Sequence, residues 1–428
     1  MNNENKTVNG KKGGTAMLLT IAYRNIWRNK RRTLFCLCAV GIAVFFIVMY
    51  SSLIDGMTNS INDVVQIFEL GHVRVVSKDY EAESEYMPVQ YPVADGRSWR
   101  ELAASIGTIP GVRAVLPRIT TMATMHESTI KHAVLWGINI EEEMALNNFN
   151  MTSRDDGLLE GRWPAPGANE CAVGMVFARK AGLTVGDRIT FKTISAQFSE
   201  KFLSPVITGI YSFDYIKFDE NYIVMDIERL QRLLNLEEGT QSLVIYAESD
   251  KMSGAITARV QNMLGDDSIV TEWNDNFWVA VMQMIWPIYT MLFLIFLIVA
   301  SFLIINTVVM IIHERIKEIG MMGCLGMTRR EIVAVFFFES VILAILGATI
   351  GVIWGALITG IGSFFPIRMG DLYGNTFSEM PMSNALFFVF EPYILIRAWV
   401  MGVVIASLFT LIPALKSAKV EPVEALRR

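Results

Sequence analysis

The amino-acid sequence predicts an integral membrane protein with four transmembrane helices and a large extracytoplasmic α+β domain of two subdomains. Of its 428 residues, 52% are hydrophobic and only 18% are charged. The mean hydropathy of +0.39 indicates more apolar surface than one soluble core can bury. Crossing a bilayer core of about 30 Å takes roughly 20 apolar residues. Four stretches are long enough: 33–54, 284–312, 332–365 and 393–415.

The distribution of charge predicts that both termini are cytoplasmic. Residues 1–32 carry 8 Lys or Arg and 1 acidic residue, whereas 55–283 carry 19 and 32. Cytoplasmic segments next to a span collect Lys and Arg, so the N-terminus is expected inside. Four spans then return the tail, 416–428, to the same side. Segment 55–283 is therefore expected outside the cytoplasm.

Residues 1–32 are predicted to be a cytoplasmic leader followed by a basic amphipathic helix. Leu18, Ala22 and Ile26 recur at helical spacing, with Arg24 and Arg28 on the other face. A plain positively charged flank of the first span is the alternative. The apolar stretch begins too far from Met1 for a cleaved signal peptide, so 33–54 is expected to remain as an anchor.

One face of the first span is rich in large apolar side chains. It carries Phe45, Phe46, Met49 and Tyr50, which are candidates for contact with acyl chains. Ordinary lipid contact or helix packing explains the same residues equally well.

The sequence of segment 55–283 is typical of a folded α+β domain. Short β-branched or alternating runs predict strands at 72–77, 133–137, 188–193, 205–210, 222–225, 242–247 and 268–272. Helices are predicted at 99–109, 175–182, 227–236 and 252–264. We expect an inner lobe interrupted by an outer lobe at about 135–215. Cys171 is the one cysteine of this segment, so no intrachain disulfide is available there.

The later spans have two notable features. Residues 277–312 carry no formal charge, which is a longer run than a bilayer requires, so the second span is expected to project outward. In the third span Gly347, Gly351 and Gly355 repeat every four residues and predict close packing with another helix. The general abundance of glycine in membrane helices is the alternative.

Residues 366–392 are expected to form an extracytoplasmic loop.

The most informative segment is 313–331, a cytoplasmic connection with the sequence HERIKEIGMMGCLGMTRRE. Its charges alternate with apolar residues at helical spacing. Gly320, Gly323 and Gly326 would each cost an isolated helix roughly 1 kcal/mol relative to Ala. Such glycines indicate a close contact or a turn. We interpret the segment as a helix that docks a partner protein, in preference to a passive loop.

The sequence offers no catalytic or metal-binding motif. The leader sequence GKKGGT lacks the spacing of a phosphate-binding loop, so the chain is not expected to hydrolyse ATP by itself. His313 and Glu314 begin a zincin-like pattern, but Lys317 stands where the second histidine is required. No cofactor, metal or nucleic acid is therefore expected.

The segment from Glu314 to Ile332, ERIKEIGMMGCLGMTRREI, resembles the signature of FtsX-like permeases, the membrane subunits of MacB and LolC/LolE type ABC transporters. The entry sequence AYRNIWRNKRRT and the closing PALKSAKVEPVEALRR are also similar to family segments. So are ELGHVRVVSKDY and the stretch that begins LLEGRWPAPGAN. The resemblance covers nearly all of 17–428.

This resemblance implies a permease subunit in the bacterial inner membrane that works as a dimer with two copies of a cytoplasmic ABC ATPase. The second permease is either identical or a paralogue. The family's ATPase-coupling residues correspond to Glu314, Arg315, Glu318, Ile319, Gly320 and Gly326. Gly323 and Cys324 depart from the family pattern, which often has a basic residue and Ala there.

The mechanism implied is mechanotransmission, in which ATPase closure moves the coupling helix and the second span acts on the outer domain. The expected cargo is an amphiphile, foremost a lipoprotein of the outer leaflet. Two alternatives are open: an FtsX-like signalling subunit that activates a cell-wall hydrolase, and MacB-like efflux of peptides or small molecules. A periplasmic carrier would dock on hairpin 194–204, which is short for that purpose.

Overall fold

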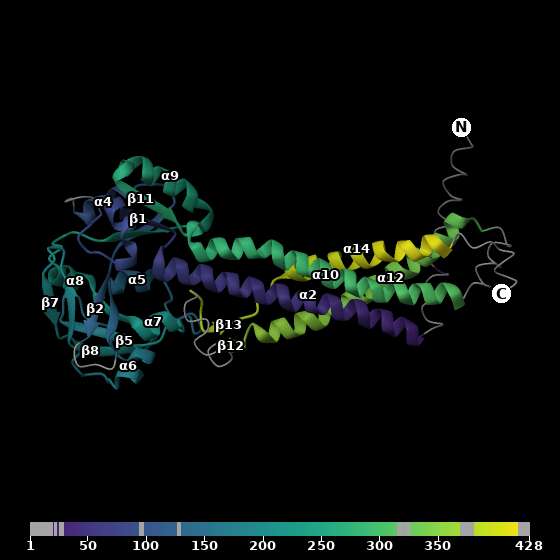
Figure 1. Ribbon diagram of the computed structural model, residues 1–428, viewed down its shortest axis with the longest axis horizontal. Coiled ribbons are helices and arrows are strands. Elements are labelled where there is room, and N and C mark those ends of the chain that lie inside the picture. Colours follow the sequence, from purple (N-terminus) through teal and green to yellow (C-terminus); the bar gives the residue numbers. More distant parts are fainter. Residues whose placement is uncertain are drawn as a thin grey trace. The chain divides into compact units, whose positions relative to one another are not determined.

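The computed structural model describes residues 20, 24, 30–93, 98–125, 130–314, 321, 327–368 and 381–417. The chain divides into two compact units. Unit 1 comprises 1–56, 284–366 and 387–428, and unit 2 comprises 57–283 and 367–386. Unit 1 is helical and unit 2 is an α/β domain (Figure 1).

Unit 1 is built from four long helices: α2 (Lys30–Val64), α10 (Phe277–Glu314), α12 (Arg329–Gly362) and α14 (Pro392–Ser417). The parts of α2, α12 and α14 in this unit share one core, to which Val44, Phe336 and Ala398 belong. Among the described residues, four helices are long and apolar enough to cross a membrane: Thr33–Glu69, Phe277–Phe296, Arg329–Gly362 and Pro392–Leu411. These helices confirm the predicted helical membrane architecture.

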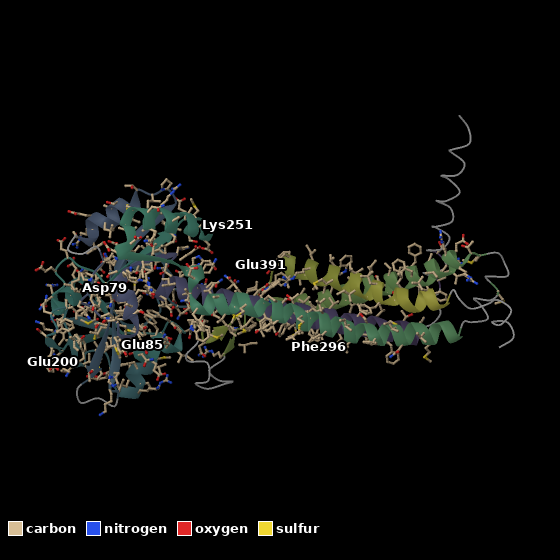
Figure 2. The ribbon with its side chains drawn as sticks, turned by 45° about the horizontal axis from the view of Figure 1, so that its top comes forward. Asp79, Glu85, Glu200, Lys251, Phe296 and Glu391 are labelled. Atoms are coloured by element: carbon tan, nitrogen blue, oxygen red, sulfur yellow. The ribbon has the colours of Figure 1, made fainter. Side chains whose placement is uncertain are left out.

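The surface of unit 1 is apolar. Phe296 is 63% exposed, and many other large apolar side chains of α10 and α12 are exposed too. Figure 2 shows few nitrogen or oxygen atoms along the helix around Phe296, whereas both elements cover the α/β unit around Glu200 and Lys251. Exposing so much apolar surface to water would be unfavourable. In a bilayer the same surface would face the lipid.

Unit 2 contains one mixed sheet of 11 strands in the order β11-β1-β10-β2-β3-β9-β5-β8-β4, with β6 and β7 attached through β2. Its strands are β1 (Val73–Ser77), β2 (Val112–Met125), β3 (His132–Ile138), β4 (Leu158–Gly161), β5 (Glu170–Gly174), β6 (Phe191–Ile194), β7 (Glu200–Leu203), β8 (Val206–Tyr211), β9 (Tyr222–Asp226), β10 (Ser242–Ala247) and β11 (Ser268–Glu272). The pairs β3 with β9 and β5 with β8 are parallel, and the others are antiparallel.

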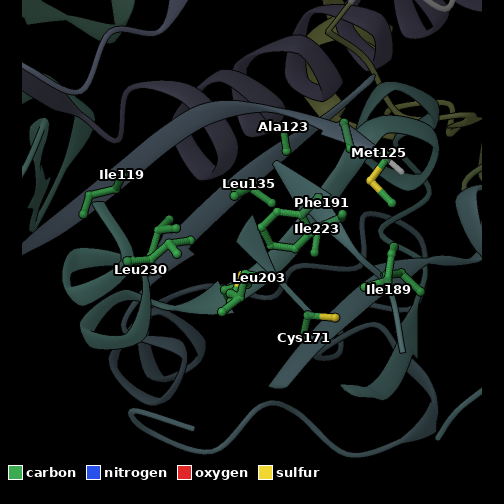
Figure 3. Packing of buried hydrophobic residues seen from close by; sticks show 14 of the residues in the cluster. Ile119, Ala123, Met125, Leu135, Cys171, Ile189, Phe191, Leu203, Ile223 and Leu230 are labelled. Atoms are coloured by element: carbon green, nitrogen blue, oxygen red, sulfur yellow. The ribbon is translucent and has the colours of Figure 1, made fainter. Parts of the chain in front are cut away.

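Helices cover this sheet at several places. They are α3 (Lys78–Ala82), α4 (Trp99–Gly107), α5 (Ile140–Leu146), α6 (Met175–Ala181), α7 (Ile216–Asn221), α8 (Ile227–Leu234) and α9 (Ser253–Leu264). Side chains alternate along the central strands: Leu135 lies in the aliphatic core of Figure 3, while its neighbour Trp136 lies in an aromatic core on the other face. A third core joins β1 and β10 to α4 and α9.

The predicted strands and helices of segment 55–283 are found with small shifts. The division into an inner lobe and an outer lobe at about 135–215 stays a prediction. The long strand β2 pairs with β10 near its start and with β3 and β6 farther along, so it connects the two ends of one continuous sheet. Strand β2 is not among the predicted strands. It contains Pro117, and proline is uncommon inside a central strand.

Segment 366–392, expected as a loop, contains a short pair of strands, β12 (Ile367–Arg368) and β13 (Ala385–Leu386). The Ser383 amide donates to Ser60 Oγ at 2.9 Å, and the Asn384 amide donates to the Asp214 carbonyl at 2.6 Å. These contacts attach 381–386 to the α/β unit.

Candidate functional site

The predicted coupling segment is described only at its edges. Glu314 is the last residue of α10, whereas Arg315, Glu318, Ile319, Gly320 and Gly326 lie outside the described residues. The next helix, α12, begins with a capping box, in which the Glu331 amide donates to Thr328 Oγ1 and the Thr328 amide donates to Glu331 Oε2 at 2.8 Å. This cap sets the residue at which the connection ends and the third span begins.

The structure places Gly347, Gly351 and Gly355 against α2. A Cβ added at Gly347 or Gly355 would lie 2.8 Å from the Cβ of Val40 or Val48, respectively. A Cβ at Gly351 would lie 2.4 Å from the carbonyl oxygen of Gly41. No side chain fits in these contacts, so α2 and α12 approach to backbone distance along this row.

The four large side chains of the first span do not share one surface. Phe46 is 58% exposed, and its ring meets that of Phe45 edge to face at 5.3 Å. Tyr50 instead contacts α10, with its ring 5.4 Å from Tyr289 and 5.2 Å from Phe293. The exposed candidate for acyl-chain contact is therefore Phe46, with Phe45 and Met49 half-buried beside it.

Two charged residues of unit 1 were not predicted as functional. Asp55 accepts a hydrogen bond from the Tyr393 hydroxyl. The guanidinium carbon of Arg397 lies 5.7 Å from the ring centre of Trp286 and 5.5 Å from that of Tyr393. The sequence signal for Arg397 was available, because it is the one charged residue in 393–415, and charge inside a span indicates function.

A buried ionic network lies beside the centre of the unit 2 sheet. Arg118, 2% exposed, donates to both carboxylate oxygens of Glu143 at 2.6 and 2.9 Å and to the Tyr246 hydroxyl at 2.6 Å. Burial alone would lower the pKa of Arg118, but the Glu143 carboxylate raises it above its ordinary value. The hydrogen bonds of Arg118 tie β2, α5 and β10 together, which is a structural role.

Asp219 on α7 is a second buried charge, 4% exposed. Its carboxylate accepts hydrogen bonds from Ser212 Oγ and from the Phe213 amide, both at 2.8 Å. Burial raises the pKa of Asp219 to about 7, and the two hydrogen bonds offset only part of that shift.

We predict that this raised pKa makes the α/β unit less stable as pH rises. Between the ordinary value of 3.8 and about 7 the folded protein holds a proton on Asp219 that the unfolded chain has lost. Stability therefore falls across that window, by up to about 4 kcal/mol. The check is thermal unfolding of the full-length protein in detergent at pH 5 and pH 8. Asp219→Asn should show a smaller difference between the two, and parallel profiles would contradict the assignment.

The hairpin of β6 and β7 exposes apolar side chains. Ile194 is 55%, Phe198 73% and Phe202 63% exposed. Phe198 lies at the turn with φ +56°, a conformation uncommon for a residue with a side chain. The predicted carrier hairpin 194–204 thus has an apolar surface, although it is short.

The described residues contain no group of three or more His, Cys, Asp or Glu that could hold a metal ion. Their cysteines, Cys36, Cys38 and Cys171, are all free thiols. Cys171 is fully buried in unit 2.

Two family models match the chain. A MacB-like periplasmic core domain matches residues 33–263, which is more than half of the sequence, and the C-terminal part of FtsX-like permeases matches 290–422. Together the matches cover both units of the structure.

Curated relatives include the lipoprotein-releasing system transmembrane protein LolC of Xylella fastidiosa, 20% identical over 360 residues, which are 80% of this chain and 84% of LolC. An uncharacterized ABC transporter permease of Methanocaldococcus jannaschii is 24% identical over 96% of this chain and 97% of its own. The macrolide export ATP-binding/permease protein MacB 2 of Yersinia pestis is 31% identical over 32% of this chain and 18% of its own.

A similar solved structure is the extracellular domain of the noncanonic ABC-type transporter YknZ from Gram-positive bacteria, with 14% identity and a TM-score of 0.32 over 47% of this chain and 99% of that one. The family itself is shown by the matching models. An ABC permease implies an ATPase partner. The chain belongs to the FtsX-like family of ABC transporter permeases, in the branch that carries a MacB-like periplasmic core domain.

Proposed function

We propose that this permease extracts lipoproteins, or closely similar acylated amphiphiles, from the outer leaflet of the inner membrane. The observation that carries the proposal is similarity to a lipoprotein-releasing protein over most of both chains, whereas similarity to macrolide-exporting MacB covers a small part of that protein. Exposing each acyl CH₂ to water costs about 0.8 kcal/mol. A lipid-anchored cargo therefore needs ATP to leave the membrane.

We propose that the energy of ATP hydrolysis reaches the outer domain through mechanical movement of the permease helices. Two ATPase copies would dock on segment 313–331 of two permease subunits, identical or paralogous, through Glu314, Glu318 and the residues around them. Closure of the ATPase dimer would move that segment and, with it, the adjoining spans α10 and α12. Both α2 and α10 are unbroken helices through the residues where the two units divide, which supports transmission along them.

The proposed orientation has both termini in the cytoplasm and unit 2 outside. We predict that an impermeant thiol reagent applied to intact cells labels a cysteine placed at Ser153, an exposed position of unit 2, but not one placed at Ser417. The native Cys171 is buried and should stay unlabelled in the folded protein. Labelling at Ser417 and not at Ser153 would reverse the orientation.

Handover to a soluble carrier is a further part of the proposal. Its support is the exposed apolar surface of Ile194, Phe198 and Phe202 on the β6–β7 hairpin, since such side chains are a common basis of protein docking. Activation of a cell-wall hydrolase would use the same outer unit without extracting lipid. MacB-like efflux would carry a cargo with no acyl anchor.

Purification of the protein with its ATPase from native membranes, followed by mass spectrometry, tests the proposal. Recovery of an ABC ATPase together with acylated proteins is the expected result. Recovery of a hydrolase with no acylated protein would favour the signalling alternative.

A further inference from the structure

A small cavity in unit 1 gathers polar groups from three membrane-spanning helices. Its volume is about 50 Å³. It is lined by Ile47, Ser51, Ile54 and Asp55 of α2, by Trp286, Tyr289, Thr290 and Phe293 of α10, and by Arg397 and Met401 of α14. By this measure one water needs about 10 to 15 Å³, so the cavity has room for several water-sized polar groups.

The cavity contains one cation and one anion that do not neutralise each other. Arg397 makes none of the ion pairs found among the described residues. Asp55 is likewise absent from those pairs and accepts from the Tyr393 hydroxyl through Oδ2. Tyr393 separates the two charges, since its hydroxyl meets Asp55 while its ring lies under the Arg397 guanidinium. Unpaired charges on spanning helices are costly, and they commonly mark a binding site.

The position of the cavity along the helices corresponds to the membrane interface. Arg397 lies five residues after the start of α14 at Pro392, which is about 8 Å along the helix. Trp286, Tyr289 and Tyr393 surround it, and Trp and Tyr are enriched where lipid headgroups meet the hydrocarbon. The ligand that reaches this level from a bilayer is a headgroup.

We propose that this cavity binds the headgroup of a phosphoethanolamine lipid. Its phosphate would meet Arg397, and its ammonium would donate hydrogen bonds to the Asp55 carboxylate. A headgroup with only negative charge would be repelled by Asp55, and one with only positive charge by Arg397. The arrangement of opposite charges thus selects a zwitterion.

The same geometry selects ethanolamine over choline. A quaternary ammonium has no N–H to donate to Asp55, and its preferred partner in proteins is the face of an aromatic ring. Arg397 already lies over the rings of Trp286 and Tyr393. A choline headgroup would therefore lack both kinds of contact here.

The test uses the full-length protein reconstituted in bilayers with equal amounts of phosphatidylethanolamine, phosphatidylglycerol and phosphatidylcholine that carry the same acyl chains. Native mass spectrometry after mild detergent extraction measures which lipids stay bound. The wild type should retain phosphatidylethanolamine several-fold over both others. Arg397→Gln should lose this enrichment, and Asp55→Asn should shift retention from phosphatidylethanolamine to phosphatidylglycerol.

Matched controls make the same chemical changes away from the cavity. Asp79→Asn changes an exposed residue of unit 2, and Arg329→Gln changes an exposed residue at the start of α12. Both variants should keep the wild-type lipid ratio. If Arg397→Gln fails to fold, Asp55→Asn decides alone, because it leaves the Arg397 guanidinium in place and removes only the carboxylate charge. Retention in proportion to the bilayer mixture, or enrichment of phosphatidylglycerol in the wild type, would overturn the proposal. Neither result bears on the identity of the cargo.

Discussion

Glu318→Lys should abolish ATP-driven output while leaving the permease inserted and folded. The residue lies in the middle of the proposed docking segment, and juxtaposing like charges at such a contact costs several kcal/mol. We therefore expect the ATPase to be lost during purification and hydrolysis in the reconstituted complex to fall to that of the ATPase alone. A passive loop between two spans would tolerate the change.

The matched control is Glu4→Lys, which makes the same charge reversal in the N-terminal segment 1–32, outside the docking segment. It should keep the wild-type amount of bound ATPase. Normal ATPase association in Glu318→Lys would refute the docking assignment, provided that both variants reach the membrane in equal amounts.

Gly351→Ala should destabilise the helical unit, although alanine is a better helix former than glycine. The added Cβ would lie 2.4 Å from the backbone oxygen of Gly41 and 3.0 Å from the Cβ of Val44. A backbone oxygen cannot rotate away, so α2 and α12 must move apart, and overpacking of this kind costs about 1 to 3 kcal/mol. Thermal unfolding in detergent measures the effect as a lower midpoint.

Gly360→Ala in the same helix separates packing from helix propensity. There the added Cβ approaches no atom closer than 3.7 Å, on the Phe390 ring. This variant should be neutral or more stable by up to about 1 kcal/mol, the propensity difference between the two residues. If the two variants unfolded at the same temperature, the close approach at Gly351 would make no measurable contribution to stability.

The sequence was most informative where a physical requirement repeats locally. Long uncharged runs predict spanning helices because a bilayer admits few charges, and the spacing of Gly347, Gly351 and Gly355 indicates a helix face without side chains. The sequence did not indicate which helix this face meets. That information depends on α2, whose contacting residues are some 300 positions away.

Features that depend on distant pairing could not be predicted. A proline such as Pro117 is unfavourable in a central strand, because it has no backbone N–H to donate. Strand β2 nevertheless contains Pro117, which pairs with Leu243 of β10 and loses only one hydrogen bond of the ladder. Asp55 and Tyr393 are 338 residues apart, and neither suggests the other without the fold. Arg397 stood out by composition, but its place beside Asp55 required the helices to be assembled.

The measurement that tests the proposed function most directly is release from proteoliposomes that contain the permease and its ATPase. A fluorescent lipoprotein with its acyl chains is placed in the same membrane, with a soluble acceptor in the surrounding water. Adding ATP should transfer the acylated protein to the acceptor without transferring an internal soluble dye across the bilayer. ATP hydrolysis with the lipoprotein still in the membrane, or with dye crossing the bilayer, would contradict extraction by mechanotransmission.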